Sequence, residues 1–361
     1  MINSGPKIAV VGASGTVGEA MLEILAARGH RARNVKALSS ERSAGEDVEF
    51  GNTQLTLEDL SGFDFTGIDY ALFSAGAAVS KAHAPRAAQA GAIVIDNTSA
   101  FRYEAHIPLA VPEVNPHVLE TVTTGSIVAN PNCSTIQMLV AVAPIYAAAG
   151  IARINVATYQ SVSGAGRRGL NELARQTAGR LNFHQPEMVA FSQPIAFNVL
   201  PQIDELMDNG YSREEMKMLW ETRKILDDPE IGVNATAVRV PVFYGHAEAL
   251  HLETRDDIGI DEVRDLLRAA PGVTLLDSGT ADHPTPVTHA AGKDDVFVGR
   301  LRRDLSHPRG ICLWVVSDNV RKGAALNAVQ IMDALESRGQ RRASAQAASV
   351  AATGLKEGRN P

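Results

Sequence analysis

The sequence of 361 residues contains only two cysteines, Cys133 and Cys312. Two cysteines do not make a disulfide framework, so we expect a protein of a reducing compartment, the cytoplasm. No spacing of cysteines and histidines matches a zinc site, and we expect no metal. No apolar run is long enough to span a membrane, and the first seven residues lack the layout of a signal peptide.

Basic residues are not in excess, because the formal net charge is −7. A binding face for nucleic acid is therefore not expected. Hydrophobic residues make up 45% of the chain and charged residues 21%, which is typical of a globular protein. The length is sufficient for two domains, and we find no internal repeats.

The stretch at residues 127–135 (IVANPNCST) predicts a short buried strand, a turn, and a helix that begins at Cys133. A cysteine at a helix start lies beside unpaired backbone N–H groups and the positive end of the helix dipole. This setting favours the nucleophilic thiolate, and the N–H groups could stabilise an oxyanion. On these residues alone, an inert buried cysteine in a core helix is an equal alternative.

The N-terminal segment has the pattern of a dinucleotide-binding fold. A strand at residues 7–11 leads into a glycine-rich turn at 12–18 and then into a helical pattern. Glycines permit a tight turn there, and the helix N-terminus faces a pyrophosphate. This context favours nucleotide binding over a purely structural turn. The residues that we expect to contact the cofactor are Gly12, Ala13, Ser14, Gly15, Thr16 and Val17.

The second strand, near residues 35–38, leads into a loop with Glu41 and Arg42. In dinucleotide folds an acidic residue near the end of this strand binds the ribose diol, whereas an arginine suits the 2′-phosphate of NADP. Arg42 therefore favours NADP, Glu41 leaves some use of NAD open, and a solvated loop charge is the alternative for Arg42.

Alternating strands and helices up to Asp96 predict a mainly parallel sheet. The strand at 69–73 ends in small residues, where the nicotinamide half of a cofactor could approach the backbone. These small residues are Ser74, Ala75 and Gly76. Arg102 follows another strand end and is well placed for an anionic ligand, with a surface salt bridge as the alternative.

After residue 150 a longer, alternating strand at 151–159 predicts a more open, partly antiparallel sheet. Ser212 and Glu215 have the spacing of a capping box, and the helix that follows is expected to turn three apolar residues inward. Those residues are Met216, Leu219 and Ile225. Segments 236–242 and 249–254 are expected to pair as a hairpin around a turn at Gly245 and His246. Cys312 lies in an apolar strand and is expected in the core.

In this order, the motifs resemble those of the aspartate-semialdehyde dehydrogenase family, in its bacterial form, over residues 5–338. The segments that carry the resemblance are GASGTVG (12–18), 39–45, LFSAG (72–76), IDNTSAFR (95–102), ANPNCST (129–135), YQSVSGAG (159–166), EEMK (214–217), VRVPV (238–242) with GH (245–246), and DNVRKGAA (318–325). Two positions depart from many relatives, Ser14 in place of Thr and Ala247 in place of Ser. Neither departure affects a catalytic atom.

The resemblance implies NADP-dependent and phosphate-dependent interconversion of L-aspartate 4-semialdehyde and 4-phospho-L-aspartate, in the biosynthesis of lysine, threonine, methionine and diaminopimelate. It implies Cys133 as the nucleophile, His246 as the acid and base, and Gln160 as the residue that positions the substrate. The other implied ligands of substrate or phosphate are Arg102, Lys217, Arg239, Glu214 and Asn132, and the further implied cofactor contacts are Ser163, Gly164 and Asn319.

The implied chemistry explains these residue types. Thiolate attack on the acyl phosphate leads to a thioester, and two fixed cations assist the departure of phosphate. Arg239 can bind a carboxylate through two parallel hydrogen bonds. An imidazole such as that of His246 titrates near working pH, so it can take the thiol proton and return it. Taken singly, Glu214 and Lys217 have the pattern of a charged helix surface, and their roles rest on the resemblance.

The expected fold is α/β, with a Rossmann-type NADP-binding domain at residues 1–132 that a C-terminal helix at 320–338 completes. Residues 133–319 are expected to form an α+β catalytic and dimerisation domain with a mixed sheet, and 340–361 a disordered tail. The resemblance implies a homodimer, with a tetramer as an alternative. Two other functions stay open, an N-acetyl-glutamyl-phosphate reductase and a non-catalytic dinucleotide-binding paralogue.

Overall fold

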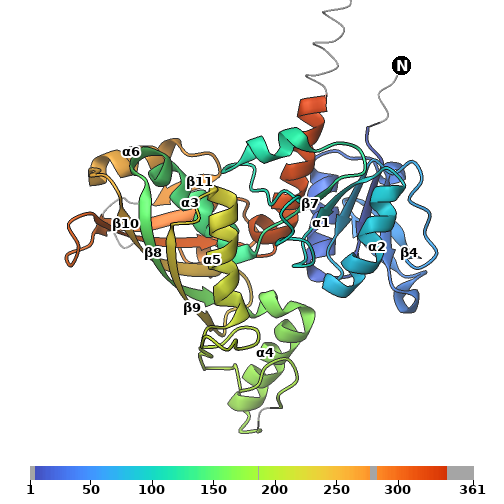
Figure 1. Ribbon diagram of the computed structural model, residues 1–361. Coiled ribbons are helices and arrows are strands. Elements are labelled where there is room, and N and C mark those ends of the chain that lie inside the picture. Colours follow the sequence, from blue (N-terminus) through green and yellow to red (C-terminus); the bar gives the residue numbers. More distant parts are fainter. Residues whose placement is uncertain (1–4, 186, 277–282, 340–361) are drawn as a thin grey trace, which may run out of the picture.

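The computed structural model describes residues 5–185, 187–276 and 283–339. Two β-sheets organise this part of the chain and lie in separate halves of the molecule (Figure 1). One sheet has seven strands from the first 129 residues, and the other has six strands from residue 151 onward. The tail expected at 340–361 lies outside the described residues.

The seven-stranded sheet has the order β3-β4-β2-β1-β5-β6-β7 and is parallel except for the pair β3–β4. Its strands are β1 (Ile8–Val11), β2 (Val35–Ser39), β3 (Asp47–Phe50), β4 (Thr53–Asp59), β5 (Tyr70–Phe73), β6 (Ile93–Asp96) and β7 (Ile127–Ala129). Helices α1 (Thr16–Ala27) and α2 (Ala77–Gln89) connect parallel strands. The chain changes direction across the sheet at β1 and β5, where such folds bind nucleotides. The predicted Rossmann-type domain is confirmed.

The helix at 326–339, which follows η6 and begins six residues later than the predicted 320–338, packs on this first half. Its buried Val329 and Met332 belong to the same core cluster as Met21 and Leu22 of α1. A helix that covers one face of the sheet from the far end of the chain ties the two halves together. Short helical turns are η1 (Ala32–Asn34), η2 (Glu41–Ser43), η3 (Pro116–Thr121), η4 (Val162–Ala165), η5 (Pro286–Ala290) and η6 (Arg321–Ala325).

The six-stranded sheet has the order β11-β12-β13-β10-β8-β9. Its strands are β8 (Ile151–Gln160), β9 (Gly232–Arg239), β10 (His246–Thr254), β11 (Val273–Leu276), β12 (Val296–Arg303) and β13 (Gly310–Ser317). Two neighbouring pairs are parallel and the other three are antiparallel, so the predicted mixed sheet is confirmed. As expected, Cys312 is buried in β13.

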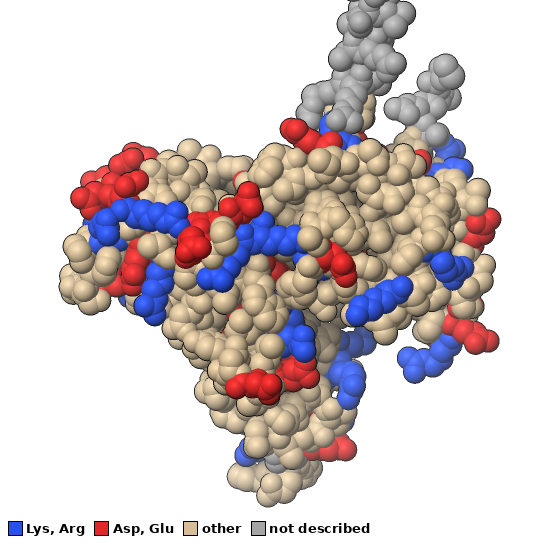
Figure 2. All heavy atoms as spheres, in the orientation of Figure 1, with Lys and Arg blue, Asp and Glu red and all other residues tan. Residues whose placement is uncertain are grey.

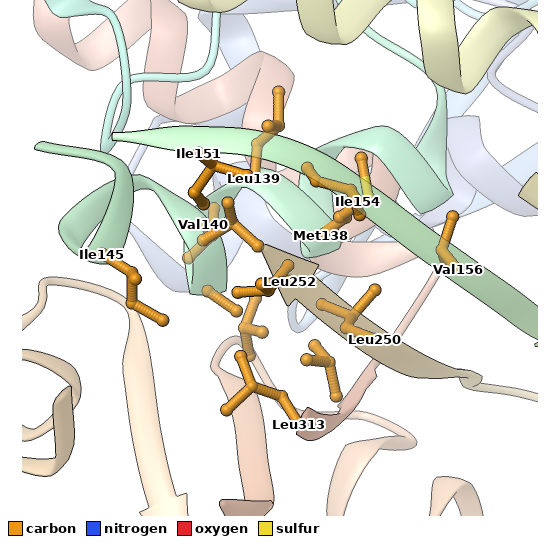
Figure 3. Close-up of a cluster of buried hydrophobic side chains, with 14 of the residues drawn as sticks. Met138, Leu139, Val140, Ile145, Ile151, Ile154, Val156, Leu250, Leu252 and Leu313 are labelled. Carbon is orange, nitrogen blue, oxygen red and sulfur yellow. The ribbon is translucent and has the colours of Figure 1, made fainter. Parts of the chain in front are cut away.

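Three helices cover one face of this sheet, namely α3 (Cys133–Ala149), α5 (Arg213–Leu226) and α6 (Ile260–Ala269). Figure 3 shows the contact: Met138 and Leu139 of α3 point at Ile154, Leu250 and their neighbours on the strands. Helix α3 is buried along most of its length, because it packs on the strands of this sheet, on α5 and α6, and on η6. The packing of α3 in the core therefore fixes the position of its first residue, Cys133.

The hairpin expected from segments 236–242 and 249–254 is wrong. Strand β8 lies between β9 and β10, parallel to the first and antiparallel to the second. Alternating burial identifies a strand but not its neighbour, and the connection at 240–245 is long enough to cross the roughly 10 Å of two strand spacings. His246 is consequently the first residue of β10 and not part of a turn.

Helix α5 begins with the predicted capping box of Ser212 and Glu215. Its buried face differs from the expected one, because Met216 and Leu219 are only partly buried. The buried residues are Glu214, Met218, Glu221, Thr222 and Ile225. Ile225 is buried as predicted, whereas two carboxylates, Glu214 and Glu221, occupy the buried face in place of Met216 and Leu219. Helix α4 (Gly166–Leu181) and the irregular chain after it project from this half of the molecule (Figure 1).

The surface carries charges of both signs. In the view of Figure 2, lysine and arginine side chains alternate with aspartate and glutamate, with no continuous basic region on that face. None of the helices among the described residues is both long enough and apolar enough to cross a membrane.

Candidate active site

A cavity of about 330 Å³ lies where the start of α3, the start of α5 and the ends of β8 and β9 meet. Seven of the eight residues predicted for catalysis or substrate binding line it, although they come from five separate segments. The lining residues are Ser99, Arg102, Asn132, Cys133, Gln160, Gly164, Ile203, Asp204, Glu214, Lys217 and Arg239. The eighth, His246, lies directly behind this wall.

Cys133 is the first residue of α3, and its sulfur is in the thiol form of a free cysteine that is partly exposed to the cavity. Asn132 caps the helix, because its Oδ1 accepts hydrogen bonds from the backbone nitrogens of Ser134 (3.0 Å) and Thr135 (3.4 Å). The backbone of Gly323 in η6 lies close to Cys133, because a Cβ on this glycine would be only 2.7 Å from the Cβ of Cys133. The cysteine is therefore held from two sides.

The thiol is protonated in the resting site. Its pKa is raised to about 12, first by burial and then by the Glu214 carboxylate, against the opposing effects of Arg239 and Arg102. The helix start still favours the thiolate, since the backbone N–H of Ser134 acts to lower the pKa of Cys133, but burial and Glu214 oppose it. Burial and the negative charge of Glu214 raise the pKa of this thiol more than Arg239 and Arg102 lower it. The proton has to leave during the attack on a substrate.

Glu214 is an ionised carboxylate at the centre of the polar contacts. Its Oε1 accepts from Asn132 Nδ2 (2.9 Å) and Gln160 Nε2 (3.2 Å), and its Oε2 accepts from Lys217 Nζ (3.0 Å). Burial alone would raise the pKa of Glu214, but Lys217 and these hydrogen bonds lower it to about 2. Lys217 also pairs with Asp204 at 2.8 Å, so its ammonium group is held at the rim of the cavity.

Glu221 holds the other side of the site, and sequence analysis missed it. Its side chain is fully buried, accepting from Arg102 Nη1 at 3.0 Å and from the backbone nitrogen of Asn132 at 2.6 Å. Arg102 also donates from Nη2 to the carbonyl of Asn97 at 2.7 Å. Glu221 follows Glu214 by seven residues, two turns of α5, so this spacing was the available signal that both carboxylates face one way.

Arg239 ends β9 beside Gln160, which ends β8. Its Nη1 donates to the carbonyl of Ser161 at 2.8 Å, and the side chain is nearly buried. Gln160 Nε2 lies within hydrogen-bond distance of Ser134 Oγ (2.9 Å) as well as of Glu214. Parallel pairing of the two strands brings an amide and a guanidinium to one edge of the cavity.

His246 is fully buried and lies next to Arg239. Its Nδ1 is 3.1 Å from the backbone nitrogen and 3.0 Å from the hydroxyl of Ser161, while its Nε2 has no hydrogen-bond partner among the described residues. Burial and then Arg239 lower its pKa to about 3, so the ring is neutral. A Cβ on Gly164 would lie 3.5 Å from Nε2 and 2.7 Å from Arg239 Nη1. A side chain at this position would displace the Arg239 guanidinium, whereas the imidazole would be at an ordinary contact distance.

A second cavity, of about 520 Å³, opens at the carboxyl ends of β1, β2 and β5. It is lined by Gly12, Ser14, Gly15, Ser39, Ser40, Glu41, Asp59, Leu60, Ser61, Ser74, Ala75, Val79 and His83. The glycine turn is shaped for close approach, since Gly12 has φ +85° and a Cβ on it would lie 2.9 Å from the Ala75 nitrogen. A compact turn before the N-terminus of α1 fits a dinucleotide diphosphate.

The other residues predicted to contact the cofactor do not line this cavity. Ala13 is buried, Val17 is half-buried, and Gly76 starts α2 with φ +95°. Arg42 is exposed in η2 beside Glu41 but does not line the cavity, and Thr16 lines a different one on the far side of α1. Ser163 and Asn319 are joined by a 3.0 Å hydrogen bond in the layer behind His246.

Sequence analysis missed several residues of the second cavity. Ser39 ends β2, so the rule that ligands bind at strand ends could have found it. Asp59 and His83 carry no local signal. They reach the cavity because β4 pairs in parallel with β2 and because α2 returns over the same edge.

The fold and the two cavities define a dinucleotide-dependent oxidoreductase with a buried cysteine pocket. Comparison with known families agrees: residues 7–122 match the model for "Semialdehyde dehydrogenase, NAD binding domain", and residues 142–322 match "Semialdehyde dehydrogenase, dimerisation domain".

More particularly, the chain belongs to the aspartate-semialdehyde dehydrogenase family. It is 54% identical to aspartate-semialdehyde dehydrogenase of Legionella pneumophila, over 91% of this chain and 95% of the relative. It is 57% identical to aspartate-semialdehyde dehydrogenase 2 of Vibrio cholerae, over 91% and 97%. It is also similar to the crystal structure of aspartate semialdehyde dehydrogenase II from Vibrio cholerae complexed with ASA, with a TM-score of 0.88 at 56% identity, over 91% and 97%.

Proposed function

We propose that this protein is an NADP-dependent aspartate-semialdehyde dehydrogenase that reduces 4-phospho-L-aspartate to L-aspartate 4-semialdehyde through a thioester on Cys133. The reaction is reversible and requires inorganic phosphate in the oxidative direction. The observation that carries the proposal is the 330 Å³ cavity, which combines a cysteine at a helix start with two nearly buried arginines and an ionised glutamate. The pathway is the biosynthesis of lysine, threonine, methionine and diaminopimelate.

The charges in the cavity match the three charged groups of the substrate. We assign the substrate carboxylate to Arg239, because its fork geometry suits two parallel hydrogen bonds. Among the described residues only one of its nitrogens donates a hydrogen bond, to the Ser161 carbonyl. Glu214 is the complementary anion for the substrate ammonium group. Arg102 pairs with Glu221, and Lys217 pairs with Asp204. These two cations are assigned to the phosphate group.

The catalytic steps follow from the protonation states. Cys133 attacks the acyl carbon as its proton is removed, phosphate leaves with the bonding electron pair, and a thioester remains. His246 is neutral and adjacent, so it can serve as the acid and base, and Gln160 and Asn132 orient the carbonyl. Bound NADPH supplies the hydride that reduces the thioester. Thiolate release then requires a proton donor, which is again the role of His246.

The finer features of the cofactor and assembly belong to the same proposal. The 2′-phosphate is assigned to Arg42, with Glu41 at the ribose, because both follow the end of β2. The second half of the chain matches a dimerisation domain, and we infer a homodimer in the cytoplasm.

The test is a spectrophotometric assay of NADPH formation from L-aspartate 4-semialdehyde, with and without inorganic phosphate. We expect turnover that requires both phosphate and the aspartyl aldehyde, and a slower reaction with NAD. Preference for N-acetyl-glutamate semialdehyde would instead assign the chain to the N-acetyl-glutamyl-phosphate reductases. Cofactor binding without any turnover would assign it to a non-catalytic paralogue.

A further inference from the structure

Unpaired polar atoms are concentrated directly behind the catalytic cavity. Six buried side-chain atoms on α3 and β10 lack a well-formed hydrogen bond among the described residues, although the Gln137 amide is close enough to the Glu248 carboxyl to interact with it. The six atoms are Thr135 Oγ1, Gln137 Nε2 and Oε1, His246 Nε2, and Glu248 Oε1 and Oε2. Buried polar atoms are nearly always paired in folded proteins, so those of Gln137 and Glu248, which lie on the two elements that carry Cys133 and His246, call for an explanation.

Periodicity places Gln137 and Glu248 in one layer beneath the active site. Gln137 follows Cys133 by four residues, one turn of α3, and so lies on the same face of the helix. Glu248 follows His246 by two residues, so both side chains are on the same face of β10. Both Gln137 and Glu248 are fully buried. The pair therefore connects the helix that carries the cysteine with the strand that carries the imidazole.

Among the described residues, no cation affects the pKa of Glu248. The groups that face it are Gln137 from α3, His246 on its own strand, Thr158 in register on β8, and Val315 in register on β13. Burial raises the pKa of Glu248 well above its ordinary value, and the Gln137 amide opposes this only in part. His246 is neutral, so it gives no compensating charge. An unpaired carboxylate in such a place would be very costly.

The layer also contacts a residue at the front of the site. Thr158, which is opposite Glu248 in the strand register, lies with its hydroxyl 3.3 Å from Gln160 Nε2. A change in the charge of Glu248 would therefore disturb the helix of Cys133 and the amide of Gln160 together.

We propose that Glu248 is a positioning residue that acts as a neutral carboxylic acid: the Gln137 amide donates to it, and this uncharged pair holds the first turns of α3 against β10. The inference rests on the proposed function only in using turnover as one readout. Ionisation of Glu248 places an uncompensated charge in this layer, so catalysis fails at alkaline pH while substrate binding at Arg239 persists.

The first test needs no activity. Infrared difference spectra of the resting full-length protein at neutral pH should show the carbonyl stretch of a protonated carboxylic acid in the wild type and in Glu253→Gln, but not in Glu248→Gln. Glu253 is the matched control, because it lies on the same strand but on the opposite, partly exposed face. Absence of the band from the wild type would overturn the proposal, whatever the enzyme turns over.

The second test is kinetic. Glu248→Gln keeps a neutral side chain of the same shape, so kcat at neutral pH should stay near the wild-type value and the alkaline loss of kcat should disappear. Glu248→Leu should lower kcat roughly 10- to 100-fold, with KM for the semialdehyde unchanged, because the reacting groups are displaced but the substrate ligands are not. Equal losses in both variants, or identical alkaline profiles of Glu248→Gln and wild type, would refute the assignment. If Glu248→Leu does not fold, the Gln variant decides alone.

Discussion

Gly323 provides a way to displace the catalytic sulfur without touching a substrate ligand. A Cβ at this position would lie 2.7 Å from the Cβ and 3.2 Å from the Cα of Cys133. Carbon atoms in contact lie about 3.5–4.0 Å apart, so Gly323→Ala must push η6 and the start of α3 apart by roughly 1 Å. Neither obstructing atom can rotate away, because both belong to the backbone or its first side-chain carbon.

The expected magnitude follows from that displacement. Overpacking of a core contact costs about 1–3 kcal/mol, which a protein of this size tolerates without unfolding. A misplacement of about 1 Å at a reacting atom can reduce the rate about 100-fold. We therefore expect Gly323→Ala to lower kcat roughly 10- to 100-fold and to leave NADP affinity unchanged, since Gly323 does not line the cofactor cavity.

The assay is the steady-state rate of NADPH formation, with NADP affinity from fluorescence titration and folding from thermal unfolding. Gly179→Ala is the control, because a Cβ there would meet only the His184 Cβ at an ordinary 3.7 Å. A Gly323→Ala protein with wild-type kcat would show that this contact does not position the sulfur, and the steric reasoning would be refuted.

Three further predictions concern single side chains. Cys133→Ala should abolish turnover but keep NADP binding, because the cofactor cavity belongs to the first sheet; this is checked by assay and titration. Arg42→Ala should raise KM for NADP far more than KM for NAD, since NAD has no 2′-phosphate. Glu214→Gln should lose stability relative to wild type above about pH 4.3, the usual carboxyl pKa, because the native pKa of about 2 is depressed. That difference should shrink as pH falls through about 2, in acid unfolding curves.

Each of these three has a clear contrary result. Turnover by Cys133→Ala would remove the sulfur from the reaction. An equal loss for both cofactors in Arg42→Ala would contradict the 2′-phosphate contact. The free energies of unfolding of Glu214→Gln and wild type could instead differ by a constant amount between pH 2 and 6. This result would show that contacts such as that with Lys217 do not lower the pKa of Glu214.

Local patterns determined the elements and many of the side chains of the site. The glycine turn at 12–18, the helix start at Cys133 and the capping box at Ser212 depend on backbone geometry within a few residues, so they are readable from one segment. The order of the motifs was specific enough to indicate the family, which the comparisons confirm.

Only the tertiary structure decided which strands are neighbours and which charges are buried. Strand β8 separates β9 from β10, and this places Gln160 beside Arg239, a proximity that no local pattern contains. Glu221 had the polar character of a surface residue and became a buried partner of Arg102. The protonation of Cys133 likewise depends on water exclusion and on Glu214, which comes from a distant helix. Electrostatic and packing effects depend on contacts between segments that are distant in the sequence, and those contacts form only when the chain folds.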